Sequence, residues 1–100
     1  MLKLTLENLF RAIENLGVEM SYGIIFIGRG GLNIEDFARF VENHYVCDEY
    51  LVQGTAYNKE IRMRIGEMRQ SPQFLQYVAR YKKMVISNKV STSLIEIELM

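Results

Sequence analysis

Residues 57–83 constrain the fold most, because their apolar and charged positions repeat with the period of an α-helix. This stretch holds seven of the chain's twelve basic residues and only two acids. On a first helix beginning at 57, one face carries Tyr57, Ile61, Ile65 and Met68, and the opposite face carries Lys59, Arg62 and Arg69. Ser71 followed by Pro72 is typical of the start of a second helix. We therefore expect two helices here, each with an apolar inner side and a basic outer side.

An edge strand is the alternative for the middle of residues 57–68. Ile61, Met63 and Ile65 alternate with Arg62 and Arg64, as side chains on the two faces of a strand would. We favour the helix because the apolar face extends to both ends of the segment. Glu60 also precedes Arg64 by four residues, which is a favourable pair on a helix. Gly66 opposes the helix by about 1 kcal/mol.

The first half of the chain indicates a helix, a strand and a second helix. Residues 6–16 have helical apolar spacing, with Thr5 as a cap and Gly17 in the position that commonly ends a helix. Tyr22–Ile27 is a continuous apolar run between glycines, which predicts a central strand covered on both faces. Residues 28–33 then form a glycine-rich turn. The next helix is expected over Ile34–Tyr45, capped by Asn33 with Asp36 at its third position.

Strands are also expected in the second half. Residues 49–52 favour a short strand before Gly54, with an extension of the preceding helix as the alternative. Met84–Ser87 and Ser93–Leu99 read as a C-terminal hairpin, because the second segment alternates apolar and acidic residues. The expected fold class is therefore α+β: one domain over residues 1–100, with about four helices packed on a small sheet that includes the hairpin.

Charge is unevenly distributed along a chain whose net charge is zero. Residues 1–54 carry four basic groups against eight acids, residues 55–83 carry seven against two, and residues 84–100 carry one against two. A neutral average argues against a protein that binds polyanions with its whole surface. The local asymmetry favours an acidic partner, or self-association of basic against acidic faces.

The sequence predicts a cytoplasmic protein that does not enter a membrane. Its single cysteine, Cys47, cannot form an intrachain disulfide. Its first ten residues lack the apolar core of a signal peptide, and the longest apolar run, Ile24–Ile27, is too short to span a bilayer.

Two groups of residues were weighed as chemical sites. The loop GRGG at 28–31, with Arg29, can present amides to an anion, but it lacks the spacing of a nucleotide-binding loop, so we expect a structural turn. The cluster of His44, Cys47, Asp48 and Glu49 has a single His-x-x-Cys pair with no second pair, which falls short of a structural zinc site, and its carboxylates offer at most a mononuclear metal site. No oxyanion hole accompanies the His–Cys pair. We expect a helix-end histidine and a small buried thiol. The sequence therefore predicts no enzyme, no metal and no cofactor.

A binding function remains as the expectation. The favoured hypothesis is a small regulatory protein, of the inhibitor, immunity or adaptor type, that docks a basic helical face on an acidic protein surface. The alternative is a nucleic-acid-binding regulator with a winged-helix-like arrangement of the helices at 57–83 and the C-terminal hairpin. Both use the same candidate residues: Lys59, Arg62, Arg69, Gln73, Gln76, Arg80, Lys82 and Lys83. Self-association into a homo-oligomer is a further possibility.

Overall fold

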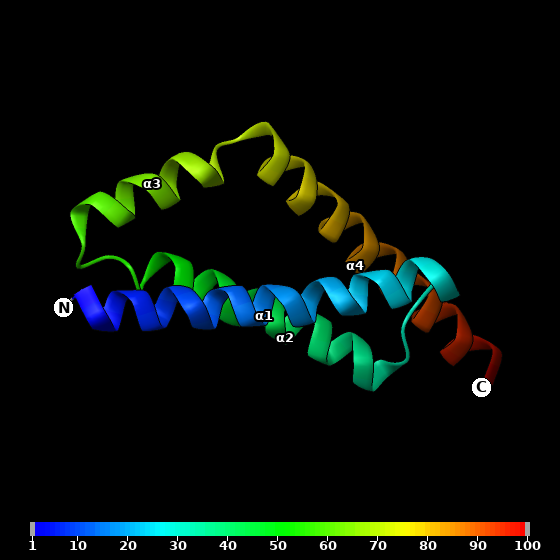
Figure 1. Ribbon diagram of the computed structural model, residues 1–100. Coiled ribbons are helices and arrows are strands. Elements are labelled where there is room, and N and C mark those ends of the chain that lie inside the picture. The colour runs from blue at the N-terminus through cyan, green and yellow to red at the C-terminus, as the bar shows by residue number, and fades with distance from the viewer. Residues whose placement is uncertain (1, 100) are drawn as a thin grey trace.

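The chain forms four helices across residues 2–99 (Figure 1). They are α1 (Leu2–Arg29), α2 (Ile34–Val52), α3 (Lys59–Arg69) and α4 (Pro72–Leu99) in a computed structural model that describes the backbone of residues 2–99 and the side chains of residues 2–88. α1 and α2 lie side by side as an antiparallel hairpin, and α3 and α4 cross one side of it. No strand occurs between residues 2 and 99. The fold is all-α, and the predicted α+β class is wrong.

The expected central strand over Tyr22–Ile27 lies inside α1, and Gly17 does not end that helix. A short apolar run is compatible with a strand or with a buried turn of helix, so its composition alone does not decide. Packing decides it here, because every seventh residue of α1 is buried against α2: Thr5, Ala12, Glu19 and Phe26. A helix that ended at Gly17 would leave out the buried residues Glu19 and Phe26.

The start of α2 was predicted correctly, and the glycine-rich turn before it is shorter than expected, because Gly28 and Arg29 belong to α1. The Asn33 side chain accepts a hydrogen bond from the amide of Asp36 at 2.8 Å, which caps the helix that begins at Ile34. Gly30 has a φ of 80°, a conformation that favours glycine. α2 then continues to Val52, so the strand expected over 49–52 is wrong. Continuing the helix buries Cys47 and Leu51 in the core.

The two basic helices are confirmed, except that α3 begins at Lys59 and leaves Tyr57 exposed outside it. The hairpin expected after them is wrong. α3 excludes the edge-strand alternative, and its Arg64 pairs with Glu60 at 3.5 Å. The Ser71 hydroxyl accepts a hydrogen bond from the amide of Phe74 at the start of α4, as expected. α4 runs on to Leu99 through the predicted strands at 84–87 and 93–99. No glycine or proline interrupts residues 73–99, so nothing in the chain opposes one long helix.

Side-chain hydrogen bonds join the ends of the hairpin to the rest of the chain. The Asn8 amide donates to the carbonyl of Gly54 at 3.1 Å, which holds α1 against the loop between α2 and α3. The amide of Leu32 donates to Oδ1 of Asn88 at 2.8 Å, which holds α4 against the turn between α1 and α2.

The molecule is elongated and is less compact than most domains of 100 residues. Its radius of gyration is 15.9 Å, with extents of 53 × 25 × 20 Å, whereas a compact domain of this length has a radius of about 13 Å. Within the described residues, none of the helices has both the length and the hydropathy of a membrane span.

Candidate functional site

The candidate binding residues fall on two helices that diverge from each other. Lys59, Arg62 and Arg69 lie on α3, and the other five lie on α4: Gln73, Gln76, Arg80, Lys82 and Lys83. All of them are exposed except Arg69, which is half-buried. Because α3 and α4 meet at an open angle (Figure 1), the cations form one group on each helix and not a single compact patch.

Arg69 has a structural contact. Its guanidinium lies 2.7 Å from the carboxylate of Asp48 on α2 and so links α3 to the hairpin. A partly exposed pair of this kind contributes up to about 1 kcal/mol. The expectation that Arg62 and Arg69 are equally free on the outer face is therefore wrong for Arg69. Tyr77 and Tyr81 of α4 turn inward, where Tyr77 is half-buried and Tyr81 is buried.

Apolar side chains are exposed among the cations. Met63 is exposed next to Arg62 on α3, and Leu75 and Ile86 are exposed on α4. Leu75 and Ile86 are eleven residues apart, about three turns, so they share one face of α4 with Lys82 between them. We call the three apolar residues Met63, Leu75 and Ile86, together with the seven exposed candidates, the basic surface. Its residues are Lys59, Arg62, Met63, Gln73, Leu75, Gln76, Arg80, Lys82, Lys83 and Ile86.

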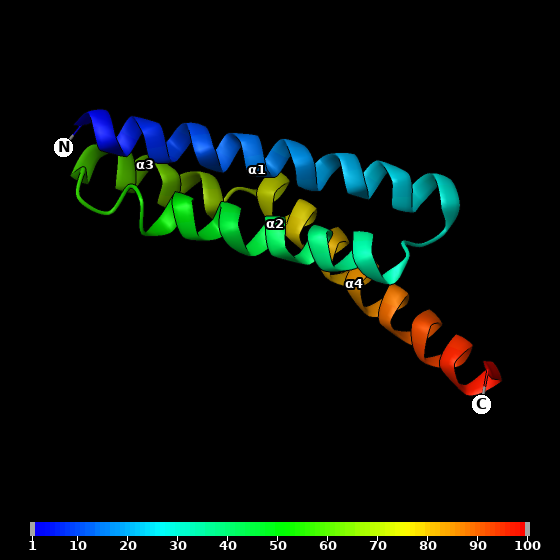
Figure 2. The same cartoon turned by 90° about the horizontal axis from the view of Figure 1, so that it is seen from below.

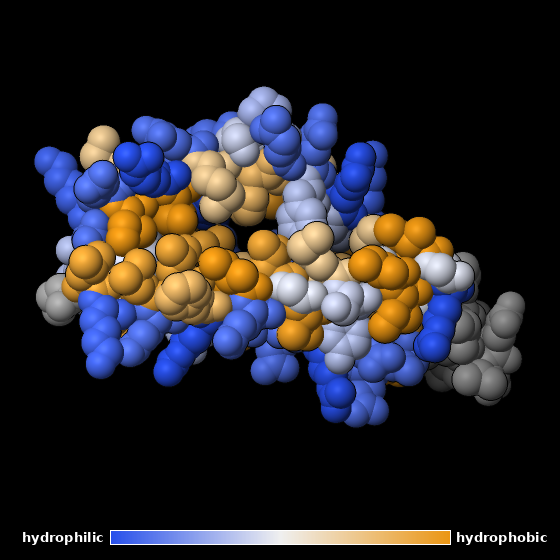
Figure 3. Space-filling model, in the orientation of Figure 1, coloured by the Kyte–Doolittle hydropathy of each residue, from blue (hydrophilic) through white to orange (hydrophobic). Residues whose placement is uncertain are grey.

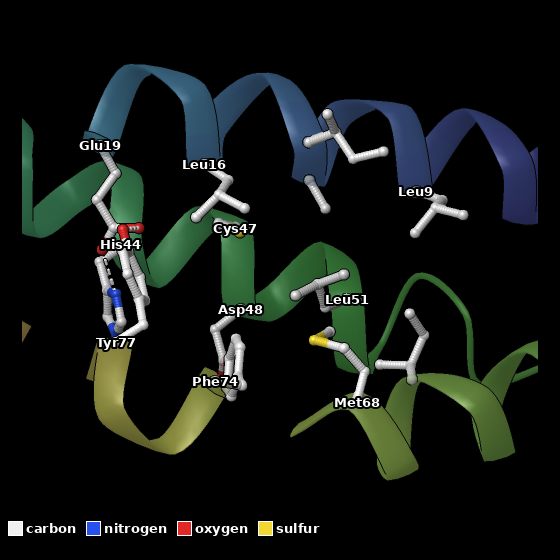
Figure 4. A pocket seen from close by; sticks show the side chains of 13 residues that line it. Leu9, Leu16, Glu19, His44, Cys47, Asp48, Leu51, Met68, Phe74 and Tyr77 are labelled. Carbon is white, nitrogen blue, oxygen red and sulfur yellow. Dashed lines mark hydrogen bonds and ion pairs between the residues drawn. The ribbon is translucent and has the colours of Figure 1, made fainter. Parts of the chain in front are cut away.

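A buried polar cluster joins α1, α2 and α4. Glu19 has only 1% of its surface exposed. Its carboxylate accepts a hydrogen bond from the Tyr77 hydroxyl at 2.8 Å and contacts Nδ1 of His44 (Figure 4). The ring of Tyr81 stacks on His44 with their centroids 3.7 Å apart. One carboxylate thus connects three helices, and sequence reasoning had not assigned it any role.

Two tyrosines of this cluster and the neighbouring Cys47 have raised pKa values. Burial, followed by the hydrogen bond to Glu19, raises the pKa of Tyr77 far above its usual range. Burial raises the pKa of Tyr81 to about 12 and that of the Cys47 thiol to about 11. Cys47 is therefore a protonated core residue and not an activated nucleophile. The expectation of a small buried thiol is confirmed, whereas His44 lies within α2 and not at its end.

An apolar cleft of about 180 Å³ separates the hairpin from α3 and α4. Figure 4 shows Glu19, His44 and Tyr77 at one end of it, with Leu9, Leu51 and Met68 towards the other. Among the described residues, no three His, Cys, Asp or Glu side chains are grouped as a metal site requires.

The glycine-rich turn serves the fold. The Leu32 amide donates to Asn88 of α4. A Cβ added at Gly31 would come within 3.2 Å of the same Asn88 oxygen, so the turn packs directly against α4. This supports the interpretation of GRGG as a structural turn.

Comparison with known proteins gives no match to a family model, to a curated protein or to a solved structure.

Alkaline pH should destabilise the folded protein. Tyr77, Tyr81 and Cys47 all have folded pKa values above their ordinary values of 10.0, 10.0 and 9.0. The folded state therefore keeps protons that the unfolded chain releases, so this stability is complete below pH 9.0 and is lost as pH rises through the folded values. The urea concentration at the midpoint of unfolding should therefore fall as pH is raised above 9.0. Tyr77→Phe should make this fall smaller. If the midpoint of the Tyr77→Phe protein fell with pH as steeply as that of the wild type, Tyr77 would not be a source of the pH dependence.

Proposed function

We propose that this protein is a small binding protein that docks the basic surface of α3 and α4 on an acidic surface of a partner protein. The observation that supports this best is that large apolar side chains are exposed beside cations on both helices: Leu75 and Ile86 share a face of α4 with Lys82, and Met63 is next to Arg62 on α3. Protein interfaces combine apolar side chains at their centre with arginine, and both Met and Arg are enriched there. The fitting partner presents an acidic helix or ridge with apolar side chains of its own.

Nucleic acid is the less suitable partner for this surface. Phosphate contacts need donors and cations, and three large apolar side chains among them contribute little. The winged-helix-like arrangement also required a C-terminal hairpin, and that segment is helical up to Leu99. The candidate cations can still attract a polyanion at low salt, so the experiment includes nucleic acid.

Charge reversal on α4 should weaken partner binding. The doubly substituted protein Arg80→Glu, Lys83→Glu carries acids in place of two cations of α4. Because both side chains are exposed, folding should be nearly unchanged. We expect capture of the partner from a cell lysate to fall about tenfold or more, since opposed charges both slow association and repel. Lys3→Glu with Arg29→Glu makes the same net charge change on α1 and is the matched control.

A second variant separates the two kinds of partner. Leu75→Ser removes an exposed apolar contact without changing charge, so it should weaken a protein complex and leave binding of a random DNA duplex unaffected. The proposal predicts that both α4 variants capture less partner and that the wild-type protein does not shift the mobility of a DNA duplex. It would be contradicted if the α1 control lost as much partner binding, or if the wild-type protein bound the duplex with an affinity that falls steeply with salt.

A further inference from the structure

A different surface, on α1, has a long apolar seam that the chain itself leaves uncovered. The seam residues are spaced alternately four and three apart along the helix: Leu6, Phe10, Ile13, Gly17, Met20, Ile24 and Ile27. The six large side chains are all exposed. Figure 3 shows apolar side chains along the front of α1, and Figure 2 shows α1 along one edge with α2, α3 and α4 on its other side. This spacing is that of a helix that packs along its length against another helix.

The total exposed surface is too large for a compact monomer. The chain exposes 7474 Å², whereas a folded monomer of 11.7 kDa is expected to expose about 5,900 Å². The excess, roughly 1,600 Å², is larger than the area of about 800 Å² that each partner buries in a standard interface. It is of the size that one subunit of a permanent dimer buries.

We propose that the α1 seam packs antiparallel against the α1 seam of a second copy of this chain. The six positions from 10 to 27 are symmetric about the point midway between residues 18 and 19. Turning the helix end for end therefore places Phe10 opposite Ile27 of the second copy and Ile13 opposite Ile24. Gly17 then lies opposite Met20, and each pair occurs twice across the two-fold axis.

Gly17 supports the antiparallel register. A glycine inside a helix costs about 1 kcal/mol relative to alanine, and an added Cβ at Gly17 would meet nothing within 4 Å in the single chain. Its small size therefore serves no contact within the chain. Opposite Met20 of a second copy, it provides room for a long side chain. In a parallel pair Gly17 would face Gly17 and leave a gap, while Phe10 would face Phe10.

The residues that flank the seam also suit a second copy. Along one side lie Glu7, Glu14, Ser21 and Gly28, so reversing the helix places each acid opposite Ser21 or Gly28 and separates like charges. A lipid surface is the competing occupant, but a membrane-surface helix carries mainly Lys and Arg on its polar face. α1 has three basic groups and three acids, which suits a protein partner better.

Pairing would also cover the openings in this face. Ile13 lines the cleft between the hairpin and α3 and α4. Met20, Ile24 and Ile27 line a second groove, between α1 and α4. The second copy therefore lies over apolar walls that one chain cannot close.

Solution mass tests the pairing with two matched variants. Light scattering should give twice the 11.7 kDa chain mass for the wild type. Ile24→Glu should give the mass of one chain, with the helical circular dichroism retained. Ile34→Glu should remain a dimer, because Ile34 is equally exposed, 68% against 69% for Ile24, but lies outside the seam. A monomeric wild type, a dimeric Ile24→Glu or a monomeric Ile34→Glu would each overturn the proposal.

Cross-linking tests the register without relying on a disruptive variant. Cys47 is buried with a raised thiol pKa, so new exposed cysteines should oxidise first. A mixture of Ile13→Cys and Ile24→Cys proteins should form a disulfide-linked pair, and neither protein alone should do so. Cross-linking of each protein with itself would overturn the antiparallel register. Wild-type protein that is monomeric in solution and sediments with anionic lipid vesicles would assign the seam to a membrane surface instead.

Discussion

Replacing Glu19 with alanine should lower the free energy of unfolding by about 3 to 5 kcal/mol. The Glu19 carboxylate is buried and is the shared partner of His44 and Tyr77. Its removal leaves two polar groups without their acceptor, and each costs roughly 1 to 3 kcal/mol when it is desolvated and unpaired. The change also enlarges the cleft beside it and weakens the connection among three helices. Such a loss is a large share of the stability of a small domain.

Urea unfolding at one fixed protein concentration measures this effect, and fixing the concentration matters because association also adds stability. Glu14→Ala is the matched control, since Glu14 lies on the same helix but is exposed. It should change stability by less than about 0.5 kcal/mol. Glu19→Gln keeps an acceptor for Tyr77 and should fall between the two. Equal stability of the Glu19→Ala and Glu14→Ala proteins would show that the buried cluster does not hold the helices together.

The starts of α2 and α4 could be predicted from the sequence because their causes are local, whereas α1 begins at Leu2, before the expected cap Thr5, and α3 begins at Lys59 and not at 57. Asn33 caps α2 and Ser71 caps α4 through hydrogen bonds to amides three residues away, so both signals lie within one short segment. The basic helix α3 was also predictable, since its apolar face and its Glu60–Arg64 pair repeat with the helical period.

The all-α class could not be predicted in the same way. Tyr22–Ile27 and the alternating residues 94–99 both satisfy strand patterns, and only the length of α1 and α4 shows that these segments continue helices. The apolar positions of α1 also extend past Gly17 with unbroken alternate spacing, from Leu6 to Ile27. That periodicity was present in the sequence. It is the signal that would have extended the helix and indicated the seam.

The site was partly predictable for a related reason. Exposure of the seven candidate residues follows from the helical period, whereas the contact of Arg69 with Asp48 joins residues that are distant in the chain. The same holds for Glu19, His44 and Tyr77. Buried polar partners from three helices cannot be paired by spacing within any one of them.

The two proposed surfaces are centred on different helices, α1 and the pair α3 and α4, and they adjoin at Arg80, which lines the groove beside the seam. A dimer formed through α1 would carry two copies of the basic surface of α3 and α4. A partner with two acidic sites would then be held at both, and the second contact would form at a high effective concentration. Loss of pairing through Ile24→Glu should therefore weaken such a complex without any change to the residues that contact the partner.

Phe40→Ala should be as destabilising as the loss of Glu19, by about 3 to 5 kcal/mol. Phe40 has 2% of its surface exposed. Its ring packs 5.1 Å from that of Tyr81 on α4 and lies beside Gly23 of α1. Truncation leaves a cavity where α2 packs against α1 and α4. Phe40→Leu fills part of that space and should lose less.

The pKa of Tyr81 provides a second measurement for Phe40→Ala. Burial raises the pKa of Tyr81 to about 12, so opening the space beneath its ring should lower that value toward the ordinary 10.0. Tyrosinate absorbance during a pH titration should detect this shift, and urea unfolding should give the stability loss. Tyr57→Ala removes an aromatic ring that is 78% exposed and should change neither. If Phe40→Ala matched Tyr57→Ala in both measurements, α4 could not be packed on the hairpin through Phe40 and Tyr81.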